Sequence, residues 1–284
     1  MFNKNRSVAR RVGMSLAAVS ALALLAGCAA GGSGGGGSDA PTAESIQEAG
    51  VLRVATLSGD APWTSVGASG VEEGFDVDLA LALGESLGVK VEFTPVDGPG
   101  RVASLQSKKV DVTIGEFSNT EERAKVVDFS TNYVWNPGQY MVRTDSGIDT
   151  TDDLDDASRV ACIQQGGTAT DLVPAHLPNV GTLSLPNTDD CVEALKSGQA
   201  DAMTQTPFYY LPLMDKNPGM FKIIDGTYGT NHISVGLQKG STELTEYVNN
   251  FLVEYQADGT LESSFEQWFG YEMPKAARPD WFKN

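Results

Sequence analysis

The stretch GFDVDLALALGESLG (residues 74–88) decides how the first part of the chain folds. After Phe75, leucines recur every four residues, and this spacing predicts a helix with one apolar face. Asp76 and Asp78 lie in its first turn, where carboxylates stabilise the positive end of the helix macrodipole, and we expect Asp76 to cap the helix. Gly88 predicts its end. The two acids are therefore expected to be structural rather than catalytic.

The segments on both sides of this helix alternate between strand and helix patterns. Apolar runs of strand length cover residues 51–57, 89–96 and 110–115, and a short helical pattern covers residues 101–109. Strands that alternate with helices in this order form an α/β sheet in which neighbouring strands are parallel.

The alternation repeats later in the chain. Strand patterns at residues 159–164, 180–186 and 200–206 are separated by helical patterns. The segment ALKSGQADAM (194–203) is similar to SLQSKKVDVT (104–113) in the order of its residue types. This internal similarity suggests two lobes of similar build rather than a repeat of short period.

The first residues have the composition of a targeting segment. Residues 1–11 are basic, residues 12–26 are apolar and too few to span a membrane, and together they predict a secretory signal peptide over residues 1–27. The motif LAGC resembles the lipobox of bacterial lipoproteins, which implies that Cys28 is the first mature residue and carries a lipid. Residues 28–43 are rich in Gly and Ser and predict a flexible tether. We expect an exported protein anchored to the outer face of the cell membrane.

Charge and cysteine content narrow the class of protein. The formal net charge of −17 at pH 7 argues against nucleic acid or an anionic membrane surface as a direct partner. With Cys28 lipidated, Cys162 and Cys191 remain as an even pair, and in an oxidising compartment they are candidates for a disulfide. No Cys or His spacing typical of zinc sites occurs, so we expect no metal and no cofactor.

Four segments together resemble the polar amino-acid family (family 3) of bacterial extracellular solute-binding proteins, which serve ABC importers. These segments are GFDVDLALALGESLG, LQSKKVDVTIG, TEERAKVVDFS and FEQWFG. The resemblance implies an α/β fold of the periplasmic-binding-protein-like type II, in which two lobes are joined by two crossover strands and a hinge closes them on the ligand. By this match, lobe 1 comprises residues 44–133 and 234–284, and lobe 2 comprises residues 138–230.

The resemblance also implies a function. A lipid-anchored member of this family captures a small polar amino acid or a related zwitterion and delivers it to an ABC permease, as a monomer and without catalysis. The alternatives are an enzyme on the same fold, similar to periplasmic dehydratases, and the ligand-binding subunit of a sensor. An enzyme would need a general acid or base next to its substrate, and only Glu116 is an obvious candidate.

One end of the implied site binds the carboxylate of the ligand. Arg123 matches the family's arginine that forks onto the ligand's α-carboxylate, and a planar guanidinium suits such bidentate binding. Ser118 matches a position used for hydroxyl or amide contacts. Gly166, Gly167 and Thr168, in the segment QQGGT, match a loop whose backbone N–H groups meet the same carboxylate. The alternatives are an arginine paired with a neighbouring surface glutamate and a turn that binds nothing.

The sequence departs from the family where the ammonium of the ligand would bind. Many relatives have an aspartate at the position matched here by Gln205 or Thr206, and no acid is present. We hypothesise that Glu116, with or without Asp60, binds the cationic end instead, which slightly favours a cationic ligand. Trp63 is expected to supply an apolar or cation–π wall. The alternative is that Glu116 points to solvent and Asp60 caps a turn.

Two further observations bear on the ligand. Gly98 occupies a position where relatives place an aromatic residue over the ligand, and Trp135 is a second candidate for the missing wall. The segments around Cys162 and Cys191 resemble a subgroup that binds acidic amino acids and glutamine. Because a disulfide belongs to the scaffold, this second resemblance says little about the ligand.

Overall fold

A computed structural model describes residues 40–278, and these residues belong to one compact unit. The predicted signal peptide, Cys28 and most of the predicted tether lie outside the described residues. No helix within residues 40–278 is long and apolar enough to cross a membrane. We keep the names lobe 1 (44–133 and 234–284) and lobe 2 (138–230) for the two predicted residue sets, and this division itself stays a prediction.

Lobe 1 is built on a sheet with β1 (Val51–Leu57) at its centre. β1 pairs in parallel with β4 (Lys90–Val96) on one side and with β5 (Val112–Thr113) on the other. The helices in its first segment are α1 (Ala43–Ala49), α2 (Phe75–Leu87), α3 (Gly100–Gln106) and α4 (Glu121–Ala124), and a short hairpin of β2 (Ser65–Val66) and β3 (Glu72–Glu73) precedes α2. The predicted alternation of strands and helices with parallel neighbours is confirmed.

The helix predicted from the first quoted stretch is α2, and only its cap differs from the expectation. Gly74 is the N-cap residue, with a φ of 138°, and a Cβ there would lie 2.3 Å from the Trp63 carbonyl oxygen, so the position requires glycine. Gly88 ends the helix in the left-handed conformation. The prediction that Asp76 caps α2 is wrong. Its side chain is fully buried and bonds to groups from outside the helix, because the N-cap position falls two residues earlier.

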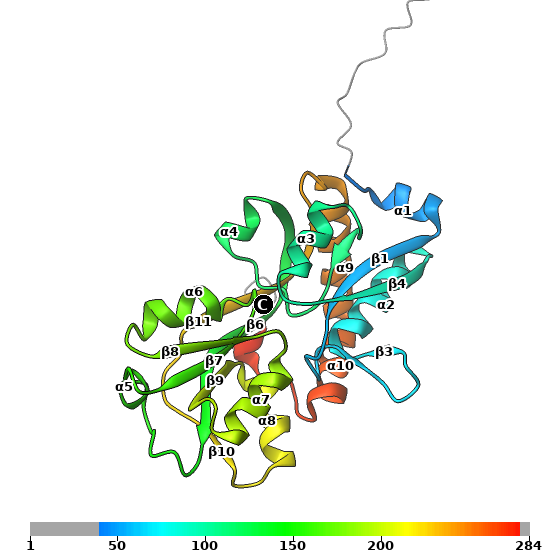
Figure 1. The fold of residues 1–284 in the computed structure, drawn as a ribbon. Helices are drawn as coiled ribbons and strands as arrows, with labels where there is room; N and C mark the ends of the chain where they lie inside the picture. Colours follow the sequence, from blue (N-terminus) through cyan, green and yellow to red (C-terminus); the bar gives the residue numbers. More distant parts are fainter. Residues whose placement is uncertain (1–39, 279–284) are drawn as a thin grey trace, which may run out of the picture. The chain divides into compact units, whose positions relative to one another are not determined.

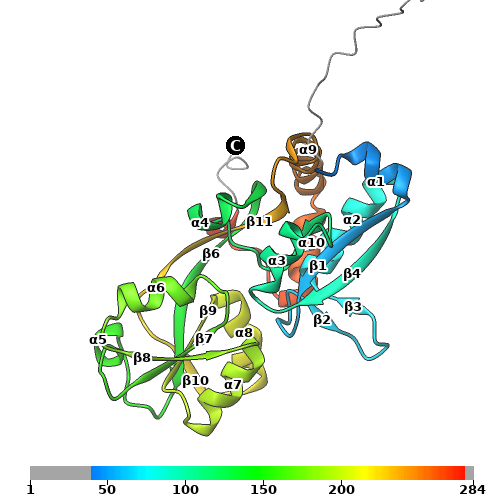
Figure 2. The same ribbon diagram turned by 45° about the horizontal axis from the view of Figure 1, so that its top comes forward.

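Two long antiparallel strands connect the lobes. β6 (Val127–Arg143) and β11 (Gly229–Gln238) pair with each other along most of their length. β11 also pairs with β5 of lobe 1, and β6 also pairs with β9 (Ala202–Gln205) of lobe 2. Figures 1 and 2 show these two strands running from one lobe into the other.

Lobe 2 repeats the strand–helix pattern. β7 (Val160–Gln164) pairs in parallel with β8 (Gly181–Leu185) and with β9, while β10 (Phe221–Ile223) pairs with β6. Its helices are α5 (Thr151–Leu154), α6 (Ala169–His176), α7 (Thr188–Ser197) and α8 (Pro207–Lys216). α6 and α7 follow β7 and β8, as expected for a unit with parallel strands.

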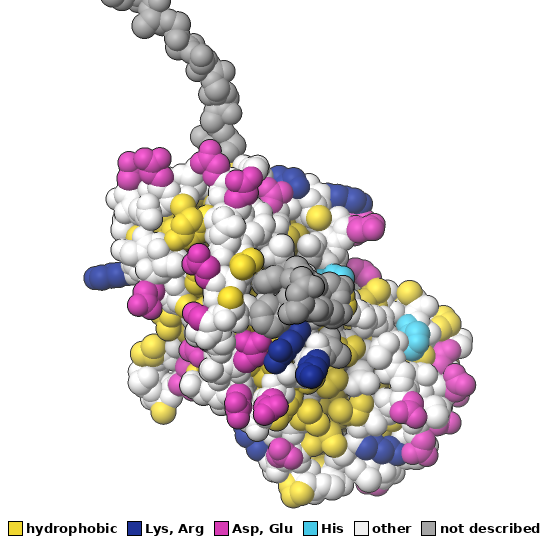
Figure 3. Space-filling model, turned by 180° about the vertical axis from the view of Figure 1, so that it is seen from behind, with side chains coloured by type: hydrophobic (Ala, Val, Ile, Leu, Met, Phe, Trp, Pro, Cys, Tyr) yellow, Lys and Arg dark blue, Asp and Glu magenta, His cyan; other side chains and the backbone are white. Residues whose placement is uncertain are grey.

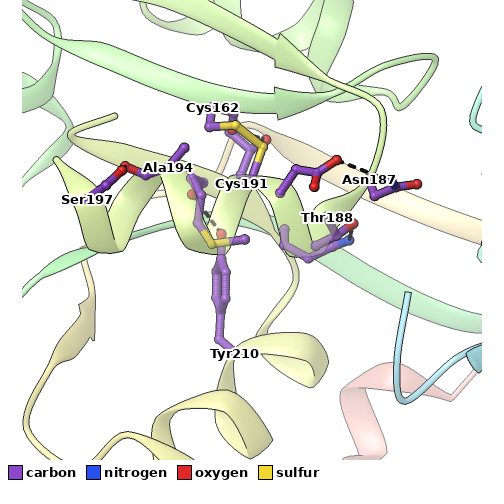
Figure 4. The surroundings of a disulfide bond; sticks show 11 residues. Cys162, Asn187, Thr188, Cys191, Ala194, Ser197 and Tyr210 are labelled. Atoms are coloured by element: carbon purple, nitrogen blue, oxygen red, sulfur yellow. Dashed lines mark hydrogen bonds between the residues drawn. A yellow bond between two sulfur atoms is a disulfide. The ribbon is translucent and has the colours of Figure 1, made fainter. Parts of the chain in front are cut away.

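A disulfide joins strand and helix in lobe 2. Cys162 of β7 and Cys191 of α7 form this bond, with their Cα atoms 5.5 Å apart, and the predicted pair is confirmed. Figure 4 shows Tyr210 of α8 pointing towards the same junction, where its hydroxyl donates to the Met203 carbonyl oxygen at 2.8 Å. The bridge spans a sequence separation of 29, and such a loop contributes about 3–4 kcal/mol in the chain-entropy model.

The last helices pack back on lobe 1. α9 (Thr242–Ala257) and α10 (Thr260–Phe269) precede the short 3-10 helix η1 (Lys275–Ala277). Asp78 of α2 accepts hydrogen bonds from Ser264 Oγ and Trp268 Nε1 of α10, both at 2.7 Å. Asp78 is thus a structural acid, as predicted. On the face drawn in Figure 3, acidic side chains are scattered over the surface, in keeping with the negative net charge.

Candidate ligand-binding site

A small polar cavity lies where loops of both lobes meet the crossover strands. Its volume of about 30 Å³ is enough for roughly two water molecules. It is lined by Arg101, Glu116, Ser118, Arg123, Gln164, Gly167, Thr168, Ala169, Thr204, Gln205, Tyr228 and Asn231. Six of the residues predicted for the ligand site are therefore brought together here, namely Glu116, Ser118, Arg123, Gly167, Thr168 and Gln205.

Arg123 lies at the boundary between the lobes. It belongs to α4, which Thr120 caps by accepting a hydrogen bond from the Arg123 backbone N–H. Its guanidinium donates to the Ser118 carbonyl oxygen at 2.7 Å and, across the cleft, to the Gly166 carbonyl oxygen at 2.6 Å. Burial lowers the pKa of Arg123 to about 9, so the group is still cationic at neutral pH. No carboxylate within the described residues forms an ion pair with it, which leaves it available to an anionic ligand.

Arg101 is a second buried guanidinium that the sequence patterns did not select. It lies in the first turn of α3 and is only 2% exposed. One signal could have revealed it: Arg101 precedes the buried Leu105 by four residues, so it occupies the apolar face of a short helix. A charged residue on such a face needs partners in the interior.

The two lobes touch directly beside the cavity. A Cβ on Gly98 of lobe 1 would lie 1.7 Å from the Gln165 carbonyl oxygen of lobe 2, and a Cβ on Gly166 would lie 2.6 Å from the backbone nitrogen of Pro99. Gly166 also has a φ of +68°, which suits glycine. The absence of an aromatic side chain at Gly98 is thus explained by close backbone packing, because any side chain there would keep these turns apart.

Glu116 also lines the cavity, and its backbone conformation is strained. Its φ of +42° is unusual for a residue with a side chain. One carboxyl oxygen accepts from Asn136 Nδ2 at 3.2 Å, and the other accepts from Gln205 Nε2 of lobe 2 at 3.3 Å. Glu116 is 8% exposed and its carboxyl group faces the interior. The alternative that it points to solvent is therefore wrong.

Asp60 lies directly behind Glu116 and does not line the cavity. Its Oδ1 accepts from Thr188 Oγ1 at 3.1 Å and from Gln205 Nε2 at 3.4 Å, both from lobe 2. Its Oδ2 is buried and accepts no hydrogen bond from an N–H or hydroxyl group of the described residues. Asp60 and Glu116 accept from the same donor, Gln205 Nε2, so their carboxyl groups are neighbours.

Burial raises the pKa values of both acids of this pair. Desolvation raises the pKa of Asp60, and desolvation together with the charge of Asp60 raises the pKa of Glu116 well above its ordinary value. A cationic group of a ligand that approached Glu116 would lower this pKa again and favour the ionised carboxylate.

The remaining predicted residues lie outside the cavity. Trp63 packs in the core of lobe 1, with its ring centroid 5.5 Å from that of Phe75 and 5.2 Å from that of Phe269, because its large apolar ring is better buried among aromatic residues. Trp135 stacks on His232 in the crossover strands, with centroids 5.0 Å apart. Thr206 is the N-cap residue of α8. None of these side chains is placed as a wall of the cavity.

The fold and this interlobe cavity define a ligand-binding protein of two lobes. The family model for bacterial extracellular solute-binding proteins, family 3, matches residues 52–271, and the chain belongs to this family. Its fold is the type II periplasmic-binding-protein fold, which the two solved structures described below share.

Individual relatives are binding proteins for amino acids. The chain is 28% identical to the L-cystine-binding protein TcyJ of Escherichia coli (strain K12) over 263 residues, which cover 92% of this chain and 97% of that protein. The solute receptor for L-cysteine of Neisseria gonorrhoeae is similar with a TM-score of 0.78 and 27% identity, covering 84% of this chain and 100% of that one. The ancestral amino acid-binding protein AncCDT-1, a precursor of cyclohexadienyl dehydratase, is similar with a TM-score of 0.75 and 31% identity, covering 80% and 99%.

Proposed function

We propose that this protein captures a small zwitterionic amino acid between its lobes and delivers it to an ABC permease. The carrying observation is that Arg123, whose guanidinium forms no ion pair among the described residues, and a buried acid, Glu116, lie on one small cavity together with polar groups of lobe 2. Arg123, with the backbone around Gly167 and Thr168, would bind the α-carboxylate. Glu116, supported by Gln205, would bind the α-ammonium.

The charges that line the cavity bear on the type of amino acid. Two guanidinium groups, Arg101 and Arg123, and one carboxyl group, Glu116, are the charged groups among its lining residues. A ligand with a second cationic group would thus meet more positive than negative charge. The sequence slightly favours an amino acid with a cationic side chain, and this preference stays a prediction. The charges that line the cavity favour an amino acid whose α-ammonium is its only cationic group. A cavity of about 30 Å³ holds about two water molecules, so the lobes must open to admit any amino acid. Cysteine is one candidate in view of the relatives.

The remaining parts of the proposal concern where the protein acts. The signal peptide and Cys28 lie outside the described residues, and the lipid anchor rests on the sequence motif alone. An anchor on a flexible tether would hold the two lobes near a permease in the same membrane. We expect a monomer, because the ligand site is completed by the two lobes of one chain.

The dehydratase alternative receives less support than transport. The relative with a link to that enzyme is itself described as an amino acid-binding protein. Glu116, next to Asp60, could donate a proton, yet the side chains that donate hydrogen bonds to it, Asn136 and Gln205, are amides, which do not relay protons.

A thermal-shift screen tests the proposed function. The exported chain, with Cys28 replaced by serine, would be heated with each of the twenty amino acids and with ornithine, citrulline, cystine and a prephenate-like acid. A ligand at about 100 times its dissociation constant adds about 2.7 kcal/mol to the unfolding free energy. We expect at least one uncharged or acidic amino acid to raise the melting temperature. Stabilisation by the prephenate-like acid alone would favour the enzyme, and no stabilisation by any amino acid would contradict the proposal.

A further inference from the structure

The guanidinium of Arg101 donates hydrogen bonds to four backbone carbonyl groups. Its Nε donates to the Gly98 carbonyl oxygen at 3.2 Å, and its Nη1 donates to those of Gly115 at 2.9 Å and Glu116 at 3.0 Å. Its Nη2 donates to the Gly166 carbonyl oxygen at 3.3 Å. Within residues 40–278 it forms no ion pair, so its charge is stabilised by these dipoles and by the acids at longer range.

Three of these carbonyl groups belong to lobe 1, and two of them, those of Gly115 and Glu116, lie in the turn that carries Glu116. The left-handed φ of Glu116 is a conformation that a residue with a side chain adopts only when its surroundings impose it. Here its peptide groups are held from both sides. Asp76 Oδ2 accepts from the Glu116 backbone N–H at 2.6 Å, while Arg101 binds the carbonyl oxygens of Gly115 and Glu116.

The fourth carbonyl group belongs to lobe 2. Gly166 presents its carbonyl oxygen to both Arg101 and Arg123, next to the point where Gly98 and Gly166 touch. The planar guanidinium fixes the angles between its donors, so its contact with Gly166 and its contacts with the Glu116 turn are geometrically linked. When the lobes separate, this guanidinium loses the acceptor that lobe 2 provides.

We infer that Arg101 is a positioning residue that couples the orientation of Glu116 to closure of the lobes. The inference rests on the proposed function, in which Glu116 meets the ammonium of the ligand. Arg101 itself acts through the backbone of the Glu116 turn and through Gly166. Arrival of lobe 2 then completes the set of acceptors around the guanidinium that holds the Glu116 turn.

A lysine at this position separates charge from geometry. The change Arg101→Lys keeps the positive charge, but one ammonium group cannot reach carbonyl oxygens that surround a planar fork and lie in both lobes. Arg101→Gln serves as a second, neutral variant if R101K does not fold. The matched control is Lys108→Arg on the surface after α3, which exchanges the same residue types away from the cavity.

The test is a double-mutant cycle measured by isothermal titration with the amino acid that binds the wild-type chain best. We expect R101K to weaken binding about tenfold or more, in line with the loss of charge-assisted hydrogen bonds in the closed form. In an E116Q background the same change should cost less than about threefold, because the group that Arg101 positions has been altered. A second cycle replaces the amino acid by its deamino analogue, and the penalty for losing the amine should shrink in R101K.

Other outcomes overturn the inference. Unchanged affinity in R101K contradicts it, and so does an equal loss in the wild-type and E116Q backgrounds, since Arg101 would then act independently of Glu116. The inference is also contradicted if removal of the ligand's amine weakens binding to R101K and R101Q as much as it weakens binding to the wild-type chain. If no amino acid binds the wild-type chain, the proposed function fails and this inference fails with it. If an amino acid binds but the effects of the two substitutions are additive, only this inference fails.

Discussion

Replacement of Gly98 by alanine should weaken ligand binding without unfolding either lobe. In the structure, an added Cβ would lie 1.7 Å from the Gln165 carbonyl oxygen and 2.9 Å from its carbonyl carbon. An unstrained carbon–oxygen contact needs about 3.3 Å, so the two turns must move apart by roughly 1.5 Å. The φ of Gly98 is not in the left-handed region, so alanine adds no backbone strain of its own.

The size of the effect follows from the hydrogen bonds beside this contact. Arg123 and Arg101 both donate to the Gly166 carbonyl oxygen, at 2.6 and 3.3 Å, and a shift of this size takes both beyond hydrogen-bond distance. A hydrogen bond to a charged group contributes about 1.5–3 kcal/mol. The Arg101 bond is long, at 3.3 Å, and counts for only part of that, so we expect the closed form to lose about 2–4 kcal/mol in all. That corresponds to roughly 30- to 1,000-fold weaker binding.

Isothermal titration of G98A and wild type with the same amino acid measures this loss. Gly181→Ala is the control, because its nearest foreign atom, the Arg159 carbonyl oxygen, is 3.1 Å away within lobe 2 and neither residue lines the cavity. The control should bind like wild type, and the melting temperature of G98A without ligand should stay close to that of wild type. Wild-type affinity in G98A would refute the closure reasoning.

Three further perturbations give distinct expected results. Burial raises the pKa of Asp76 to about 7. Between about pH 4 and 7 the folded chain therefore keeps a proton on Asp76 that the unfolded chain has lost. The stability from this group is complete below about pH 4 and is lost as the pH rises through 7, by up to about 4 kcal/mol. Asp76→Asn should therefore flatten the fall in melting temperature between pH 5 and 8, and an unchanged slope would show that other groups cause it. The double change of Cys162 and Cys191 to serine should cost about 3–4 kcal/mol in chemical denaturation. Ligand affinity should change less than threefold, and a larger loss would mean that the bridge shapes the site. Glu116→Gln should weaken amino-acid binding about tenfold or more yet spare a deamino analogue, and equal losses for both ligands would contradict an ammonium-binding role.

Local patterns in the sequence were sufficient for the secondary structure around the site. The four-residue spacing after Phe75 and the glycine at position 88 placed α2 correctly, because both depend on neighbours within one helix. The cysteine pair was also found, since only two cysteines remain in the exported chain after Cys28.

The interior polar contacts could not be predicted in the same way. Asp76 looked like a helix cap, yet its partners are the Glu116 backbone N–H and the Tyr133 hydroxyl, which lie 40 and 57 positions away in the sequence. Whether an acid at a helix start bonds locally or into the core depends on which distant groups fold against it. The left-handed turn at Glu116 has no signal either, because such turns are expected at glycine rather than glutamate.

Two site assignments failed or were missed for reasons of packing. Trp63 was expected at the ligand because it stands next to Asp60, but its ring is fully buried among Phe75, Phe208 and Phe269. Arg101 was passed over although it falls on the buried face of α3. Adjacency in sequence is thus a poor guide to a site formed between lobes, whereas a charge on an apolar helix face is a useful one.

The central claim is that the cavity holds an amino acid between Arg123 and the Glu116 region. Its most direct test is a titration of wild type and Arg123→Met with the amino acid that stabilises the wild-type chain, compared at one pH and ionic strength. Because a bidentate pair between guanidinium and carboxylate would be lost, we predict about 100-fold weaker binding or more in R123M, with an unchanged melting temperature of the free protein. Equal affinity in the two proteins would contradict the account, since the ligand would then bind elsewhere.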